Sequence, residues 1–220
     1  MIIFGLFGKT GSGKTEILEK LKKDHPVINI EKIAGTRGSV LGDLYHGNMS
    51  NQEEFNNKIN EKIEKSKEIG YLIVEYEGRR IGGIKKLNIP TLLAELKNYN
   101  YKILIDCPYE HQINRLVSWY KPKNKGEKNL LLERLEILKE SFKNKYMVEK
   151  IEIIIKMVQE EEYYKAAKFI ERDIYRNHYN RNLKKIKPDL IVNNVDTDKS
   201  VKLINDFIME KLKKVNISGR

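Results

Sequence analysis

The sequence predicts an α/β domain built on a doubly wound parallel sheet, and two observations carry this prediction. Short apolar runs typical of buried strands alternate along the chain with segments of helical spacing. The chain has 220 residues, which suits one α/β domain with a helical insertion. Because helices alternate with the strands, we expect the strands to be parallel and joined by right-handed crossovers.

Five apolar runs predict the strands of this sheet. In chain order they are 2–7, 27–30, 71–75, 101–106 and 190–193. Short apolar runs of this kind are typical of strands that are buried on both faces. Two of the runs end in a carboxylate, at Glu75 and Asp106. Because ligands of open α/β sheets bind beyond the carboxyl ends of the strands, we expect Glu75 to point at the site.

Helical spacing marks five segments outside the strands. In chain order they are 14–23, 51–68, 90–98, 111–120 and 199–213. The pattern is clear in the second, where Phe55, Ile59 and Ile63 recur at intervals of four. Residues 35–47 are rich in glycine and polar residues, so they predict a loop near the ligand.

The stretch 121–187 is long, charged and helical in pattern, and strand signals in it are scarce. We expect residues 1–220 to form a single domain with this stretch as a lid-like helical insertion before the last strand. The formal net charge of the chain is +11, and residues 111–190 hold 19 Lys and Arg against 12 Asp and Glu. Such an excess fits either nucleic-acid binding or a lysine-rich solvated surface.

Several classes of protein are disfavoured by composition. The single cysteine, Cys107, excludes an intramolecular disulfide and fits a reducing compartment. A packed thiol before Pro108 is favoured over a nucleophile. The start lacks a basic signal region, and no apolar run approaches membrane-spanning length, so we expect a cytoplasmic protein without membrane contact. The four histidines show no zinc-ligand spacing.

The strongest motif is GKTGSGKT, which follows the first strand and opens the first helix. It fits the P-loop pattern, so the predicted class is a P-loop NTPase-type domain. Glycines let the backbone curl so that its N–H groups face a phosphate, and the helix N-terminus adds positive charge. Lys14 would reach the phosphates, and the Thr15 hydroxyl would bind Mg²⁺. The phosphate-binding residues are expected to be Gly8, Lys9, Thr10, Gly11, Ser12, Gly13, Lys14 and Thr15.

Charged residues elsewhere complete the expected site. Glu75 would hold a Mg²⁺-bound water or orient a nucleophile, and Glu77 is a second candidate. Arg37 and Arg79 would clamp phosphate with their planar donor groups. A basic group of residues would suit stacking on a nucleotide and binding its phosphates. These are Arg115, Arg172, Arg176, His178, Tyr179 and Arg181.

The ordered blocks of the chain resemble the P-loop domain of tRNA 2-selenouridine synthase. The similar blocks are GKTGSGKTEIL, INIEKIAGTRGSVLG, NQEEF, VEYEGRRIGGIKKLNIP and LIDCPYEHQINRLVSWY, which span about half the chain. Thr36 replaces the family's histidine before Arg-Gly-Ser, and His178-Tyr179-Asn180 replaces its tyrosine-aspartate-proline stretch. Full-length members also carry a rhodanese-like domain with a catalytic cysteine before the P-loop, and this chain begins at the P-loop strand.

The resemblance implies that sulfur of 2-thiouridine at the tRNA wobble position is replaced by selenium. Selenophosphate is the implied donor, and an S-geranylated uridine made from geranyl diphosphate is the implied intermediate. The chain is therefore interpreted as the P-loop subunit of a split synthase, with Lys14, Arg37 and Glu75 as catalytic residues and a separate rhodanese-like partner. The basic group named above is then expected to contact tRNA. The P-loop ligand stays open among ATP, GTP, geranyl diphosphate and selenophosphate. An ATP-dependent small-molecule or tRNA kinase and a non-enzymatic nucleotide-binding module are the alternatives.

Overall fold

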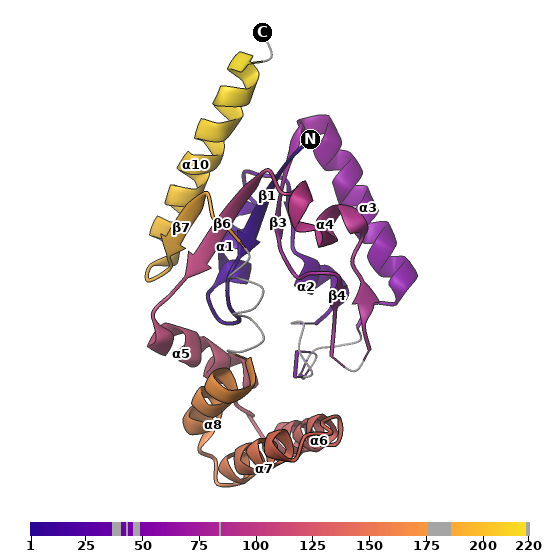
Figure 1. Ribbon diagram of the computed structural model, residues 1–220, viewed down its shortest axis with the longest axis vertical. Helices are drawn as coiled ribbons and strands as arrows, with labels where there is room; N and C mark the ends of the chain where they lie inside the picture. Colours follow the sequence, from indigo (N-terminus) through magenta and orange to yellow (C-terminus); the bar gives the residue numbers. More distant parts are fainter. Residues whose placement is uncertain (37–40, 43, 46–48, 84, 176–185, 219–220) are drawn as a thin grey trace.

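The computed structural model contains a parallel sheet of five strands in the order β2-β3-β1-β6-β7 (Figure 1). It describes residues 1–36, 41–42, 44–45, 49–83, 85–175 and 186–218. The strands are β1 (Ile2–Phe7), β2 (Val27–Ile28), β3 (Tyr71–Glu75), β6 (Tyr101–Asp106) and β7 (Leu190–Asn193). From β1 the chain goes to the edge strand β2 and returns to β3, and it then crosses to β6 on the other side of β1 and ends at β7, so the strand order switches beside β1. This confirms the predicted α/β class.

Helices cover both faces of the sheet. They are α1 (Lys14–Leu21), α2 (Ile30–Ala34), α3 (Gln52–Ile69), α4 (Thr91–Ala94), η1 (Leu96–Asn98) and α10 (Thr197–Ser218), whereas α5 (Tyr109–Tyr120) lies beyond the end of β6 (Figure 1). Alternate side chains of β1 enter two cores. Ile3 and Phe7 pack with α2, α3 and α4, whereas Phe4 and Leu6 pack with α1 and α10. A side chain at Gly5 would not fit, because a Cβ there would lie 2.4 Å from the Tyr99 ring.

Most expected elements are present, and three differ. The second strand ends at Ile28, because the side chain of Asn29 accepts a hydrogen bond from the Lys32 N–H at 2.8 Å and so caps α2. A two-stranded antiparallel hairpin, β4 (Arg80–Ile81) with β5 (Leu87–Asn88), was not expected. The segment 90–98 is divided between α4 and η1.

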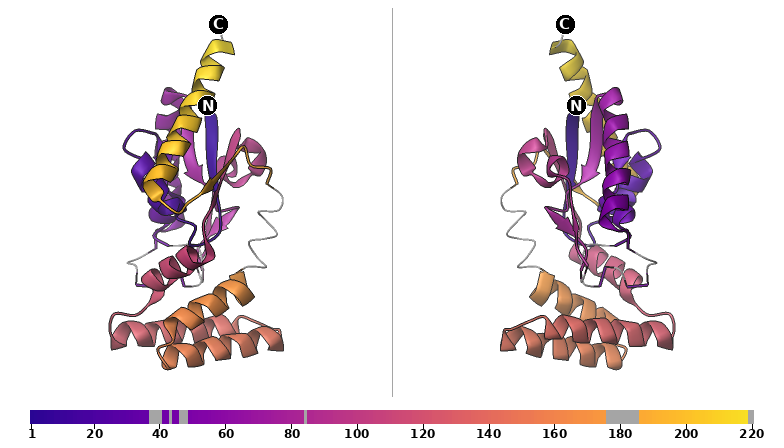
Figure 2. Two further views of the ribbon diagram at one scale, coloured as in Figure 1. Left: turned by 90° about the vertical axis from the view of Figure 1, so that its left-hand side faces the viewer. Right: turned by 90° about the vertical axis from the view of Figure 1, so that its right-hand side faces the viewer.

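The stretch 121–187 contains a group of helices beyond the carboxyl end of the sheet (Figures 1 and 2). They are α6 (Lys125–Glu140), α7 (Lys145–Gln159), α8 (Tyr163–Ile170) and the π-helical segment η2 (Glu171–Tyr175). These helices share a third core, which Leu41 and Leu44 join from the loop after α2. We propose that the group is the expected insertion. Across the described residues, no helix is both long enough and apolar enough to cross a membrane.

Candidate phosphate-binding site

The P-loop leaves β1 at Gly8 and enters α1 at Lys14. Gly11 has φ of 82° and Gly13 has φ of 94°, which side chains disfavour. Space is also short, because a Cβ on Gly13 would lie 2.2 Å from Nδ2 of Asn194. The loop therefore needs glycine at these positions for conformational and steric reasons.

Side chains from other elements hold two carbonyl oxygens of the P-loop. Nε2 of Gln112 donates to the Thr10 carbonyl at 2.7 Å. Nδ2 of Asn194 donates to the Ser12 carbonyl at 2.9 Å, and the Ser200 hydroxyl orients Asn194 by donating to its Oδ1 at 2.9 Å. With these carbonyls bonded to the protein, the loop is fixed in one orientation.

Arg115 and Lys14 hold two further carbonyl oxygens. Arg115 donates to the Gly11 carbonyl at 3.3 Å and pairs with Glu16 at 3.1 Å. Nζ of Lys14 donates to the Gly8 carbonyl at 3.0 Å. The first amides of a helix have no intrahelical acceptor, so the amides at the start of α1 remain for a ligand. The Lys14 ammonium would transfer its hydrogen bonds to a bound phosphate.

Seven of the eight predicted P-loop residues, Lys9 to Thr15, line one pocket, and Gly8 is not part of its lining. Glu31, Glu77 and Trp119 complete the lining. Trp119 comes from the same helix as Gln112 and Arg115, at helical spacing along one stripe of α5. This stripe is the face of α5 that meets the P-loop, and Arg115, one of the residues expected to contact tRNA, lies against the phosphate loop.

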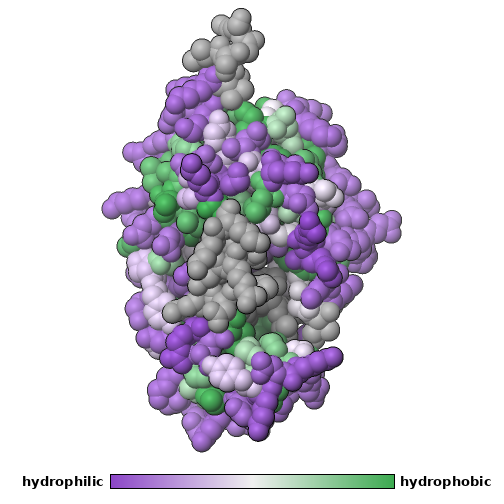
Figure 3. Space-filling view, viewed as in Figure 1, coloured by the Kyte–Doolittle hydropathy of each residue, from purple (hydrophilic) through white to green (hydrophobic). Residues whose placement is uncertain are grey.

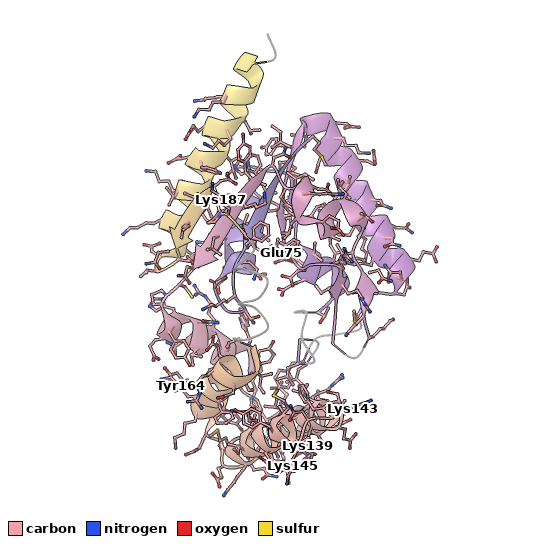
Figure 4. All side chains as sticks on the ribbon, viewed as in Figure 1. Glu75, Lys139, Lys143, Lys145, Tyr164 and Lys187 are labelled. Carbon is pink, nitrogen blue, oxygen red and sulfur yellow. The ribbon has the colours of Figure 1, made fainter. Side chains whose placement is uncertain are left out.

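Three carboxylates lie near one another at the pocket: Glu31 and Glu77 line it, and Glu75 is buried behind the lining. Glu31 accepts a hydrogen bond from the Thr15 hydroxyl at 3.2 Å. The Glu31 backbone N–H donates to Oε1 of Glu75 at 2.9 Å, whereas Oε2 of Glu75 has no hydrogen-bond partner. Glu75 is 0% exposed at the carboxyl end of β3 (Figure 4). Burial, and then the nearby charges of Glu31 and Glu77, raise the pKa of Glu75 well above its usual range.

Glu77 differs from Glu75 because it is half-buried and lines the pocket. Desolvation and the charge of Glu31 raise its pKa to about 7. A carboxyl group with this pKa exchanges a proton near neutral pH, which is the property required of a general acid or base. The second carboxylate of the sequence analysis is therefore better placed than Glu75 to meet a ligand.

Oxygen donors suited to Mg²⁺ are present at the pocket. The Thr15 hydroxyl and the Glu31 carboxylate are adjacent and would fit the ion, which prefers oxygen ligands. The expected role of Glu75 as a metal ligand remains a proposal, and its burial favours action through Glu31. Across the described residues, no group of three or more His, Cys, Asp or Glu forms a metal site.

Replacing Glu75 by glutamine should make stability less dependent on pH. A carboxyl group whose pKa is higher in the folded than in the unfolded state stabilises the folded state fully at pH values below its unfolded pKa. This contribution is lost as the pH rises through the folded-state pKa. We expect the melting temperature to fall between pH 5 and pH 8, and to fall several degrees less in Glu75→Gln. About 1 kcal/mol corresponds to roughly 2–4 °C at this size. If the melting temperature falls equally in Glu75→Gln and in the exposed control Glu53→Gln between pH 5 and pH 8, this account is wrong.

The other predicted residues lie apart from the pocket or outside the described residues. Arg79 is exposed and pairs with Glu95 at 2.9 Å, so clamping would require it to leave Glu95. Arg172 pairs with Asp173 at 2.7 Å on η2. The residues outside the described part are Arg37, Arg176, His178, Tyr179 and Arg181.

Cys107 packs beside the P-loop. Its Sγ lies 3.7 Å from the Gly11 carbonyl, and the residue is half-buried. Burial raises the pKa of the thiol, so the protonated form dominates at neutral pH. Both observations agree with the expected packed thiol.

Four residues of this site were missed by the sequence analysis. They are Glu31, Gln112, Trp119 and Asn194. The sequence contained a signal for Asn194, because this residue comes directly after the last strand. It therefore lies at the carboxyl end of the sheet, as Glu75 does at the end of β3. Gln112 and Trp119 are also seven positions apart, which is about two helical turns, so both lie on one face of the helix. Their contact with the P-loop depends on tertiary packing, which periodicity does not give.

The sheet order and the glycine loop before α1 define a P-loop α/β domain. Comparisons of the sequence carry the assignment further. Residues 1–193 match the family described as the tRNA 2-selenouridine synthase AAA domain. The chain belongs to this family of tRNA-modifying enzymes, which confirms the resemblance seen in the sequence.

Individual relatives differ in how much they share. An uncharacterized protein of Methanocaldococcus jannaschii is 65% identical over 99% of this chain and 96% of its own length. The tRNA 2-selenouridine synthases of Nitrosomonas eutropha and Nitrosomonas europaea are 29% and 32% identical over 51% of this chain. Those matches span 29% of each synthase. The crystal structure of TT1252 from Thermus thermophilus is 13% identical in sequence to this chain. Its superposition covers 96% of this chain and 97% of TT1252, with a TM-score of 0.46.

Proposed function

We propose that the chain acts in tRNA 2-selenouridine synthesis by transferring the geranyl group of geranyl diphosphate to 2-thiouridine at the wobble position. The observation that supports this most is the P-loop pocket in a member of the synthase family. A diphosphate leaving group suits the amides at the start of α1 together with the Lys14 ammonium. The proposed setting is the cytoplasm.

The proposed step forms a bond between the uridine sulfur and C1 of geranyl diphosphate. The bond between C1 and the diphosphate oxygen breaks, and diphosphate leaves with the electron pair. Lys14 and the loop amides stabilise the charge that develops on this group, and Mg²⁺, if held by the Thr15 hydroxyl, would supply further positive charge. The nucleobase loses its N3 proton, and Glu77 is the proposed acceptor because it lines the same pocket.

The helical group offers a basic surface for tRNA. Lys139, Lys143 and Lys145 lie together where α6 passes to α7 (Figure 4). The side chain of Lys145 is 91% exposed, and its distance to Glu149 is 4.0 Å. Much of the visible surface of this part is hydrophilic (Figure 3). Exposed lysines displace counterions from phosphates, so we propose that this end of the group contacts the tRNA backbone.

Binding of tRNA should weaken steeply as salt rises. Each neutralised phosphate contributes about −0.9 for duplex or about −0.7 for single strands to the slope of log K against log salt. We expect Lys143→Ala/Lys145→Ala to make this slope shallower by about 1–2. Filter binding of 2-thiouridine tRNA between about 50 mM and about 200 mM salt measures this slope. The control, Lys22→Ala/Lys23→Ala, removes equal charge at the end of α1, and an equal effect of both variants would disprove the assignment.

Nucleoside mass spectrometry tests the proposed function directly. The chain is incubated with 2-thiouridine tRNA, geranyl diphosphate and Mg²⁺, and the tRNA is then digested. Formation of S-geranyl-2-thiouridine supports the proposal. Phosphate transfer from ATP to an unthiolated acceptor would favour the kinase alternative, and nucleotide binding without turnover would favour the regulatory module.

A further inference from the structure

A groove lined by uncharged polar side chains lies between α3 and the segment that runs from β5 into α4. Its volume is about 370 Å³, and sites for small ligands measure about 300–1,000 Å³. Among the described residues, no Lys, Arg, Asp or Glu lines it. It is named the amide groove here, because the side chains of its lining include the carboxamides of Gln52, Asn56, Asn60 and Asn88.

Gln52 holds the two walls of the amide groove together. Its Nε2 donates to the Asn88 carbonyl at 3.0 Å, and its Oε1 accepts from the Asn88 N–H at 2.8 Å. Nε2 also donates to Oδ1 of Asn56 at 2.9 Å, which fixes that amide in one orientation. Asn60 and Thr91 are exposed and also line the groove. The groove is therefore a preformed set of hydrogen-bond donors and acceptors that a ligand can reach.

Positive charge lies beside the groove on the hairpin of β4 and β5. Arg80 of β4 lies directly opposite Asn88 of β5, so both side chains are on one face of the hairpin. Arg80 is exposed, as are Lys85 and Lys86, which precede β5. A ligand in the groove therefore meets uncharged donors and acceptors in the lining and cations at the edge.

The hairpin also connects the groove with the phosphate pocket. Glu77 lines that pocket, and Arg80 follows it by three residues. Because three residues span at most about 11 Å, the backbone of Arg80 lies within that distance of Glu77. The hairpin follows the carboxyl end of β3, which is the end of the sheet where the P-loop lies (Figure 1). A chain-like ligand with one unit in the phosphate pocket would extend along the hairpin toward the groove.

Unpaired nucleotides have the chemistry that fits this surface. The edge of a base presents donors and acceptors side by side, and the carboxamides of Asn and Gln pair with such edges, as they do with adenine. The phosphates are negatively charged, which suits Arg80 and Lys86. RNA is read mainly at single-stranded loops, where the base edges are accessible. A peptide would use the carboxamides but would not require the cations.

We propose that the amide groove binds unpaired nucleotides of the tRNA next to the one that enters the phosphate pocket. The carboxamides of Asn56 and Asn60 contact the base edges, and Arg80 and Lys86 contact the phosphates. The inference rests on the proposed function, because it requires tRNA as the substrate. It adds recognition of bases, which the lysines between α6 and α7 do not supply.

Asn60→Ala should weaken the binding of an anticodon stem–loop RNA that carries 2-thiouridine at the wobble position. We expect a loss of affinity of about three- to tenfold, because one hydrogen bond to a base is removed. The slope of log K against log salt should keep its parental value, since no charge is removed. Asn57→Ala is the matched control, because Asn57 is exposed on the same helix but outside the lining. It should change the affinity less than about twofold.

Arg80→Ala/Lys86→Ala should change the salt dependence as well as the affinity. Each lost contact to a phosphate of single-stranded RNA makes the slope shallower by about 0.7. A fully paired RNA of the same length should bind Asn60→Ala and the parent equally, because its bases pair with each other.

Filter binding of the stem–loop and the duplex, together with nucleoside mass spectrometry, separates the outcomes. A loss in Asn60→Ala that is confined to the stem–loop and leaves the salt slope unchanged supports the inference. Unchanged binding in Asn60→Ala, or an equal loss in Asn57→Ala or with the duplex, overturns it. The proposed function then still stands if the parent makes geranylated tRNA. If the parent makes none but Asn60→Ala loses affinity for the stem–loop, the groove remains an RNA site and the proposed function fails.

Discussion

Replacing Lys14 by alanine should weaken the binding of geranyl diphosphate, pyrophosphate and ATP alike. Hydrogen bonds to charged groups contribute about 1.5–3 kcal/mol, which corresponds to about a ten- to hundredfold loss of affinity. Nζ of Lys14 lies 3.0 Å from the Gly8 carbonyl oxygen of the P-loop. Removing the Lys14 side chain therefore removes the charged donor that α1 offers to the phosphates. Calorimetry of each ligand against the parent measures the loss.

The control for this prediction lies on the same helix. Lys20 is exposed on α1 and pairs with Asp198, so Lys20→Ala removes an equal charge away from the loop. It should leave binding of each ligand unchanged. If Lys14→Ala binds every phosphate ligand as the parent does, the P-loop is not the ligand site.

The chain by itself should produce geranylated tRNA without completing selenation. Among its 220 residues Cys107 is the single thiol, and it packs against the Gly11 carbonyl with a raised pKa. A thiol in the protonated form is a poor carrier for selenium. We expect selenouridine to appear only when a rhodanese-like protein with a reactive cysteine is added. Mass spectrometry of nucleosides after incubation with geranyl diphosphate and selenophosphate gives both products in one measurement.

Cys107→Ser provides the control for the partner prediction. It should leave geranylation, and selenation with the partner protein, at parental rates. Full conversion to selenouridine by this chain without a second protein would disprove the need for a partner. Loss of that conversion in Cys107→Ser would then identify Cys107 as the carrier.

Local patterns in the sequence were sufficient to predict the sheet and the P-loop. Buried parallel strands are continuous apolar runs, and β1, β3 and β6 end at the residues predicted. Glycine at positions 11 and 13 meets a conformational requirement that is local to the backbone. The hairpin of β4 and β5 was not predicted, because each strand has two residues and forms no periodic pattern.

The surroundings of the phosphate site were decided by tertiary structure. Gln112 and Asn194 reach the P-loop from 102 and 182 residues away along the chain, so no local pattern could pair them with it. The sequence likewise marked Glu75 as a strand-end carboxylate, but packing buried it and brought Glu31 to the Thr15 hydroxyl. Chain periodicity determines which face of an element is apolar. Only the packing of distant elements determines which polar groups meet at the end of the sheet.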